Sequence, residues 1–86
     1  MVPIRELLNR IRWDRKFGTG TFLIGYFDHV KQTIIQVPFS TIRFEEGNSF
    51  SFRLEDEDGE SILIPLHRVR TVVRDGMVIW KRAGPG

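Results

Sequence analysis

The first thirteen residues place hydrophobic side chains at helical spacing. Apolar residues recur every three or four positions, at Ile4, Leu7, Leu8 and Ile11, which forms one stripe of an amphipathic helix. Pro3 suits the first turn of such a helix, because its fixed φ fits helical geometry and its missing N–H would have no partner there. The pattern predicts a helix from Pro3 to about Arg12.

Trp13 leaves two interpretations open. In a continuing helix its ring would point away from the apolar stripe, on the side of Glu6 and Arg10. Either the helix ends before Trp13 and the ring joins the core, or Trp13 is a surface aromatic side chain among basic residues. We expect the core position.

Two pairs of β segments follow the helix. Residues 22–28 (FLIGYFD) and 33–39 (TIIQVPF) predict a hairpin, and Pro38 indicates an edge position or a strand end. In residues 49–54, Phe50, Phe52 and Leu54 alternate with polar residues, which is typical of a strand with one buried face. Residues 61–65 repeat this alternation after the turn EDEDGE, so we expect the second pair to be antiparallel too.

The clearest turn signal is Asp75-Gly76, between VRTVVR and MVIWK. An Asp-Gly pair favours a two-residue hairpin turn with positive φ at both positions. This turn predicts that Arg74 pairs with Met77, and that the following pairs are Val73–Val78, Val72–Ile79, Thr71–Trp80 and Arg70–Lys81. Alternation then places Val69, Thr71, Val73, Val78 and Trp80 on a core face. The opposite face, basic at one end and apolar in its middle, would hold Arg70, Val72, Arg74, Met77, Ile79 and Lys81.

Together these elements predict an α+β fold. The N-terminal helix would pack on a twisted antiparallel β-sheet of about five to six strands, either open or curled into a partly open barrel. We expect one domain over residues 1–82, because 86 residues are too few for two ordinary domains. Residues 83–86 (AGPG) would form a flexible tail.

The amino-acid composition excludes several classes of site. The chain has no Cys, which excludes disulfides and thiolate zinc sites, and two His are too few for an all-imidazole metal cage. Neither a metal nor another cofactor is implied. We find no signal peptide and no apolar run long enough to span a membrane, so the expected location is the cytoplasm.

Charge is segregated along the chain. Residues 1–20 carry five basic and two acidic side chains, and residues 66–82 carry five basic and one acidic. Residues 45–60 carry one basic and seven acidic side chains. A basic surface built from the two ends of the chain would attract polyanions. The alternative is that these segments are ordinary solvated faces.

The strongest candidate for chemistry is IPLHRVR at residues 64–70. It brings His67, Arg68 and Arg70 into one short segment after a buried strand, and imidazole and guanidinium groups are suited to hold a phosphate. The alternative is a His that satisfies a turn beside solvated Arg side chains. Asp28-His29 resembles a catalytic pair, but adjacent strand residues point to opposite faces, which favours a turn. The acidic run 55–58 lacks the spacing of a calcium loop and is interpreted as a solvated turn.

The chain resembles a known family through five blocks in the same order. The blocks are RELLNRIRWD (5–14), IGYFDH (24–29), VPFSTI (37–42), IPLHRVR (64–70) and RDGMVIW (74–80). They are similar to small, mostly archaeal proteins of the RNA cyclic group end recognition domain, which elsewhere is fused to two-histidine phosphoesterases and nucleotidyltransferases. The resemblance implies an RNA end with a cyclic phosphate as ligand. The implied polar motif positions are Trp13, Asp14, Asp28, His67, Arg68, Asp75 and Trp80, of which Asp75 and Trp80 already have structural explanations in the hairpin.

We therefore expect a non-enzymatic RNA-binding module. His67, Arg68 and Arg70 would hold phosphate, with Arg12, Trp13 and Arg74 as neighbours and Asp14 and Asp28 as weaker candidates. Two alternatives remain open. A cyclic phosphodiesterase would need His29 and His67 as general acid and base, and a protein-interaction module of an RNA-processing complex would use the apolar strip Val72, Met77 and Ile79.

Overall fold

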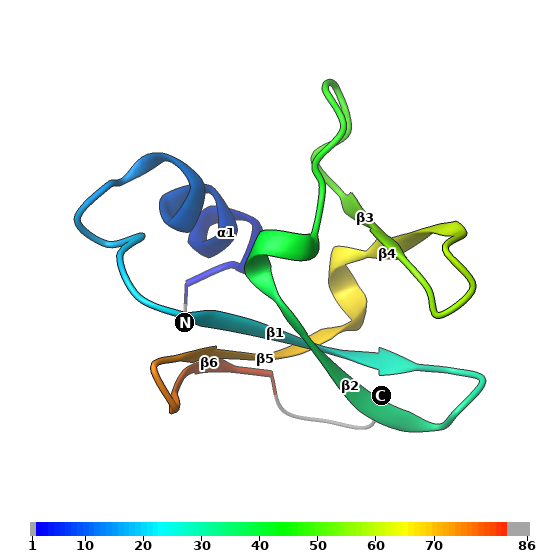
Figure 1. Ribbon diagram of the computed structural model, residues 1–86. Helices are drawn as coiled ribbons and strands as arrows, with labels where there is room; N and C mark the ends of the chain where they lie inside the picture. The colour runs from blue at the N-terminus through cyan, green and yellow to red at the C-terminus, as the bar shows by residue number, and fades with distance from the viewer. Residues whose placement is uncertain (1, 83–86) are drawn as a thin grey trace.

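The computed structural model describes residues 2–82, so the predicted tail at residues 83–86 lies outside the described residues. One helix, six strands and two short 3-10 helices follow one another along the chain (Figure 1). In order they are α1 (Ile4–Trp13), β1 (Phe22–Asp28), β2 (Thr33–Pro38), η1 (Phe39–Thr41), β3 (Ser51–Glu55), β4 (Ser61–Pro65), η2 (Leu66–Arg68), β5 (Val69–Arg74) and β6 (Met77–Lys81).

The N-terminal helix is confirmed, and its four stripe residues are all buried. The helix ends at Trp13 and is followed by its C-cap Asp14, whose carboxylate accepts hydrogen bonds from the backbone N–H groups of Lys16 and Phe17. The core position expected for Trp13 is wrong, because the helix continues through it and leaves the side chain 72% exposed. Trp13 is therefore a surface aromatic side chain.

The strands are antiparallel, and they form two sheets where we expected one. The larger sheet has the order β2-β1-β5-β6, and β3 and β4 form a separate two-stranded sheet. Strand β2, which ends at Pro38, lies at an edge as predicted. The helix and the β3–β4 hairpin both lie over one face of the larger sheet (Figure 1), so the described chain is an open two-layer α+β structure and not a closed barrel.

Both early hairpins have the predicted antiparallel pairing. One residue in them differs from expectation. Strand β3 begins only at Ser51, and Phe50 before it is 72% exposed instead of buried. Its backbone carbonyl accepts a hydrogen bond from Leu66 N–H, so the chain at Phe50 is fixed against η2 while the ring faces solvent.

The Asp75-Gly76 turn is confirmed, with φ of 49° and 86°. The pairs Arg74–Met77 and Val73–Val78 are also confirmed. Beyond them the predicted register is wrong, because a bulge shifts the pairing so that Val72 faces Trp80 and Thr71 faces Lys81. A second irregularity, between β1 and β5, pairs Gly25 with Thr71 but Tyr26 with Val69. Each bulge adds an unpaired residue and reverses the alternation of side chains.

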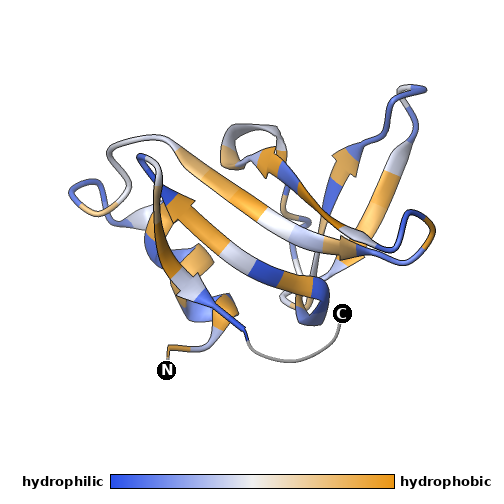
Figure 2. Ribbon diagram, turned by 90° about the horizontal axis from the view of Figure 1, so that it is seen from below, coloured by the Kyte–Doolittle hydropathy of each residue, from blue (hydrophilic) through white to orange (hydrophobic). Residues whose placement is uncertain are grey.

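The bulges change which residues of β5 reach the core. Val72 was expected on the basic face, but it is fully buried, as is Val69. Hydrophobic positions concentrate on the strands and on the inner side of the helix, while most connecting loops are hydrophilic (Figure 2). Trp80 is buried as predicted, and its indole N–H donates to the carbonyl of Val2 at 2.7 Å, which ties the last strand to the start of the helix. No helix in residues 2–82 is long and apolar enough to cross a membrane.

Candidate nucleic-acid interface

The segment after β4 is built to expose His67 and Arg68. Its flanking residues are anchored, since Leu66 and Val69 are buried and Leu66 N–H is bonded to Phe50. Between these anchors the single turn of η2 leaves His67 exposed and Arg68 half-buried. The sequence therefore holds a His and an Arg at the surface on a turn that is fixed at both ends.

Two further guanidinium groups gather at the same turn. Arg70 and Arg82 each donate from Nη1 to the backbone carbonyl of His67, at 2.6 and 3.1 Å. Arg82 is held there because its backbone N–H pairs with the Arg70 carbonyl and its guanidinium lies 5.3 Å from the centre of the Trp80 ring. We call His67, Arg68, Arg70 and Arg82 the η2 basic cluster.

Arg68 has unused donor capacity. Its Nε is buried and has no hydrogen-bond partner among the described residues. Within residues 2–82 no carboxylate lies within ion-pair distance of Arg68 or of Arg82. A buried donor without a partner is unfavourable, and because no carboxylate neutralises Arg68, its charge remains for an arriving anion.

Asp28 lies near this cluster but has a structural task. Its Oδ1 accepts hydrogen bonds from the backbone N–H groups of Val30 and Lys31, at 2.8 and 3.1 Å, and so closes the β1–β2 turn. The Lys31 N–H holds the pKa of Asp28 below its ordinary value; desolvation opposes this, and the Val30 N–H and the charges of Lys31 and Arg68 reinforce it. Asp28 is better explained as a turn residue than as a ligand contact.

Histidines 29 and 67 do not form a bonded pair. The His29 ring packs edge-on against Phe27, with ring centres 5.4 Å apart. Among residues 2–82 no hydrogen bond joins either imidazole ring to another side chain. Nor do three His, Asp or Glu side chains of that range gather as a possible metal site.

A second basic and aromatic group lies at the C-terminal end of α1. The guanidinium of Arg12 lies 4.7 Å from the Trp13 ring centre and 4.1 Å from that of Phe44. Stacking of this kind keeps an Arg extended and its edge donors available. Of the predicted neighbours, Arg12 and Trp13 are thus in contact with each other.

Arg74 is separate from the η2 basic cluster. It lies at the far end of β5, roughly 15 Å from Val69 by strand length. There its guanidinium lies near the Phe17 and Phe22 rings, at 5.3 and 5.6 Å, and Nη2 donates to Thr19 Oγ1. Asp14 and Asp75, from the same end, cap backbone N–H groups of Lys16, Phe17 and Thr21.

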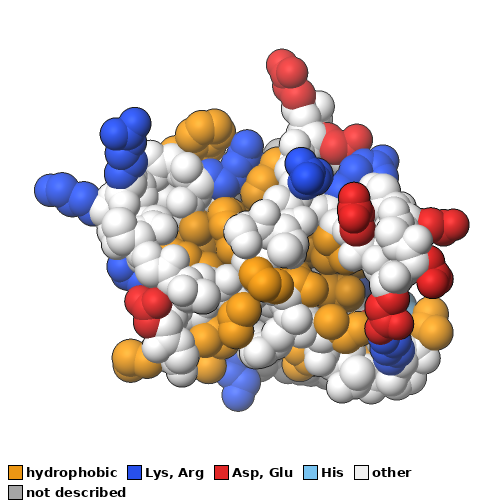
Figure 3. All heavy atoms as spheres, viewed as in Figure 1, with side chains coloured by type: hydrophobic (Ala, Val, Ile, Leu, Met, Phe, Trp, Pro, Cys, Tyr) orange, Lys and Arg blue, Asp and Glu red, His pale blue; other side chains and the backbone are white. Residues whose placement is uncertain are grey.

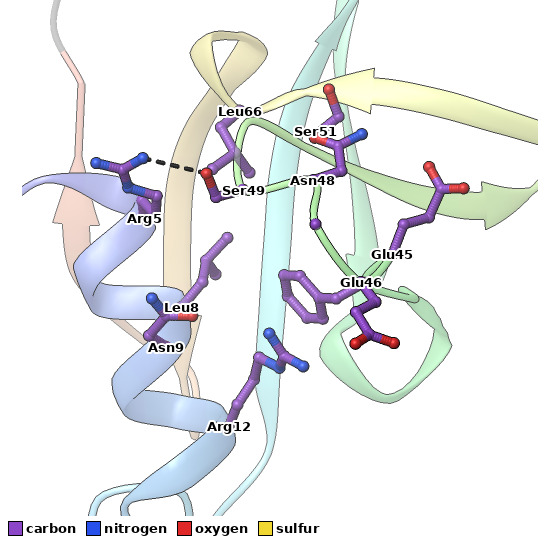
Figure 4. A pocket seen from close by; sticks show the side chains of 12 residues that line it. Arg5, Leu8, Asn9, Arg12, Glu45, Glu46, Asn48, Ser49, Ser51 and Leu66 are labelled. Atoms are coloured by element: carbon purple, nitrogen blue, oxygen red, sulfur yellow. Dashed lines mark hydrogen bonds between the residues drawn. The ribbon is translucent and has the colours of Figure 1, made fainter.

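A cleft connects the η2 turn with the Arg12 stack (Figure 4). It lies between α1 and the 44–51 loop and has a volume of about 460 Å³. Arg5, Asn9 and Arg12 project from the helix along one wall, and Leu66, the residue before His67, lines the opposite end from Arg12. We call this space the α1 cleft.

Acidic side chains concentrate on one side of the molecule, although Asp28 lies near the η2 basic cluster and Glu45 and Glu46 line the α1 cleft. In Figure 3 most acidic side chains gather over the β3–β4 side, while basic side chains lie both there and on the helix side. Lys31 there is paired with Glu57 at 3.2 Å, and Arg53 with Glu45 at 3.0 Å. The acidic segment of the sequence therefore forms an acidic side of the surface, which disfavours approach of an anion from that side.

The chain is similar to a known family of proteins. Residues 1–82 match the family model described as the MJ1316 RNA cyclic group end recognition domain. The chain belongs to this family. It is 33% identical over 84 residues to the UPF0248 protein SSO2687 of Saccharolobus solfataricus, covering 94% of this chain and 98% of the relative. A UPF0248 protein of Metallosphaera sedula is 31% identical over 81 residues, covering 94% of each, and one of Thermococcus sibiricus is 28% identical over 89 residues, covering 96% and 88%. No solved structure matches the chain.

The family description names recognition and not catalysis.

Four residues of the candidate interface in this member of the RNA cyclic group end recognition family were not predicted from the sequence. They are Arg5, Phe44, Phe50 and Arg82. Arg5 and Arg82 were counted in the basic segments, but their positions depend on contacts across 44 residues for Arg5 and 15 for Arg82, which spacing along the chain does not reveal.

Proposed function

We propose that this protein binds RNA near an end that carries a phosphate, and that the η2 basic cluster holds the phosphate. The observation that carries the proposal is Arg68, which has no ion-pair partner among residues 2–82 and lies beside an exposed His67. A guanidinium fork and an imidazole donor together offer charge-assisted hydrogen bonds to phosphate oxygens. The family description supports an RNA end with a cyclic group as the ligand. The proposal takes this group to be a cyclic phosphate.

Arg82 extends the phosphate site beyond the residues expected from sequence. Its Nη1 and that of Arg70 share one carbonyl oxygen, so two guanidinium groups are held near the turn in a fixed arrangement. Such preorganisation lowers the entropy that would be lost when a ligand binds. Phosphate would enter where Arg68 and Arg82 both reach solvent.

The test compares short RNA oligomers that differ only in their end. His67→Ala and Arg68→Ala should each weaken binding to an oligomer with a 2′,3′-cyclic phosphate by about 1.5–3 kcal/mol, the usual contribution of a hydrogen bond to a charged group. Fluorescence anisotropy measures this, and the loss should be smaller for the same oligomer with a hydroxyl end. Arg15→Ala, which removes an exposed basic residue just after α1, is the matched control and should change little.

Equal losses for both oligomers would reduce the cluster to a general basic patch. If His67→Ala lowered the melting temperature strongly with no separable effect on binding, His67 would be a structural residue of the turn.

A second candidate function rests on strand β6. This strand is an edge of the larger sheet, and Met77, Val78 and Ile79 on it are 72%, 58% and 40% exposed. Exposed apolar side chains on an edge strand favour contact with another protein. Val72 was predicted to belong to this strip, but it is buried and does not contribute to it. If the double variant Met77→Ser/Ile79→Ser lost binding to a protein partner but kept binding to RNA, this second function would be supported.

A further inference from the structure

The α1 cleft differs in chemistry from the η2 basic cluster. Most of the polar side chains that line it between its two arginines are uncharged, namely Asn9, Asn48, Ser49 and Ser51. The Asn48 Oδ1 accepts the backbone N–H of Phe50, which leaves its amide N–H groups for a ligand. Asn9 is exposed on the helix and lines the cleft (Figure 4). Amides and hydroxyls can pair with the edges of nucleobases and with a ribose hydroxyl.

A guanidinium beside an aromatic ring stands at each end of the cleft. At one end Arg5 lies 5.3 Å from the centre of the exposed Phe50 ring and donates to Ser49 Oγ at 3.3 Å. At the other end Arg12 lies over Phe44. The two arginines are seven residues apart on α1, a rise of about 10 Å. Aromatic and guanidinium planes are the surfaces on which unpaired RNA bases stack.

The wall opposite the helix disfavours phosphate. Glu45 and Glu46 both line it, and although Glu45 is paired with Arg53, no ion pair involves Glu46 within residues 2–82. A carboxylate repels a phosphate but accepts hydrogen bonds from base amino groups. The cleft therefore suits the uncharged part of a nucleotide.

Position links the cleft to the phosphate site. Leu66 lines the cleft, and the next residue, His67, belongs to the η2 basic cluster. The Leu66 end of the cleft is therefore the end that lies nearest to the proposed phosphate site along the chain.

We propose that the α1 cleft receives the base and ribose of the terminal nucleotide, between the Arg5–Phe50 and Arg12–Phe44 pairs. This inference rests on the proposed function, because it takes the η2 basic cluster as the phosphate site. The protein would then recognise the whole terminal nucleotide and not its phosphate alone.

Three RNA oligomers of equal length test the inference by anisotropy. The first ends in a normal nucleotide with a 2′,3′-cyclic phosphate, the second ends in 1-deoxyribose with the same cyclic phosphate but no base, and the third ends in a normal nucleotide with free hydroxyls. The second should bind about 10-fold more weakly than the first, within the range measured for stacking of one base. Equal affinity for the first two would overturn the cleft proposal. If the third were then still weaker, the proposed function would stand, and if all three bound equally, both would fall.

A variant that fills the cleft gives an independent measurement. Asn9→Phe places a ring in the cleft without replacing a buried residue, and it should abolish the difference between the first two oligomers while leaving the preference for phosphate. Glu6→Phe adds the same ring to an exposed helix position that does not line the cleft, so it should keep the difference. Circular dichroism melting checks that both variants fold. A base preference that survived in Asn9→Phe would contradict the inference.

Discussion

Gly25 in β1 and Thr71 in β5 face each other so closely that a Cβ on Gly25 would collide with the Thr71 hydroxyl. The register shift between these strands begins at this pair, and on its far side Val69 and Arg70 lead back to the η2 basic cluster. The glycine therefore permits the close approach of two central strands at the place where the site is attached to the sheet.

Gly25→Ala should accordingly destabilise the protein by about 1–3 kcal/mol, the usual cost of overpacking a core. Thr71→Ala removes the colliding atom, which is itself buried without a hydrogen-bond partner among the described residues. The double variant should thus recover most of the stability in urea denaturation. Additive losses in the double variant would show that the two residues do not collide.

Gly76→Val should destabilise the β5–β6 hairpin by about 1–2 kcal/mol, because a β-branched residue tolerates positive φ poorly. Gly76→Asn is the matched control and should lose less, since Asn adopts this conformation more readily. Thermal melting compares the two variants. Equal melting temperatures for Val and Asn would indicate that the turn does not need the left-handed conformation.

RNA binding should weaken as salt rises, because bound phosphates release counterions. With about three phosphate contacts at the η2 basic cluster, the slope of log affinity against log salt should be about −2 for a single strand. Arg82→Ala should reduce the magnitude of the slope by roughly 0.7, the value for one contact. If the RNA affinity of the native protein did not change with salt concentration, nucleic acid would be excluded as its ligand.

Asp28 should make stability depend on acid pH. Its pKa is lowered in the folded protein, so its contribution is present above the pKa of the unfolded chain and is lost as pH falls through the lowered folded value. Asp28→Asn keeps an oxygen that can accept the turn hydrogen bonds but does not titrate, and it should flatten this part of the stability curve. Denaturation between pH 5 and about pH 2 measures the difference. An unchanged curve in Asp28→Asn would assign the acid dependence to other carboxylates.

The sequence predicted those parts of the fold that depend on local patterns. The helical stripe, the hairpins and the Asp75-Gly76 turn follow from spacing and turn chemistry, and all three are confirmed. Contacts across the chain decided the rest. The bulges that bury Val72 depend on which strands flank β5, and the split into two sheets depends on how the β3–β4 hairpin packs.

The candidate site was predictable to the same degree. His67 and Arg68 are adjacent and lie on one turn, so their proximity could be read from the chain. The exposure of Trp13 and Phe50 could not be settled from the chain alone. An aromatic residue at the end of an apolar pattern is usually buried, and only the neighbouring elements show otherwise. Arg82 reaches His67 only through the pairing of β6 with β5.

The hydrogen bond from Trp80 to Val2 spans 78 positions of the chain. Contacts between such distant residues carry a large loop-closure entropy and slow folding, since the intervening chain must be ordered first. Arg82 depends on the same strand, because its backbone pairs with Arg70 and its guanidinium lies beside the Trp80 ring. During synthesis, which proceeds from the N-terminus, β1 and β2 can pair long before β6 exists. A nascent chain would therefore hold its first hairpin early, yet would acquire the complete set of arginines at the η2 turn only after its last strand had joined the sheet.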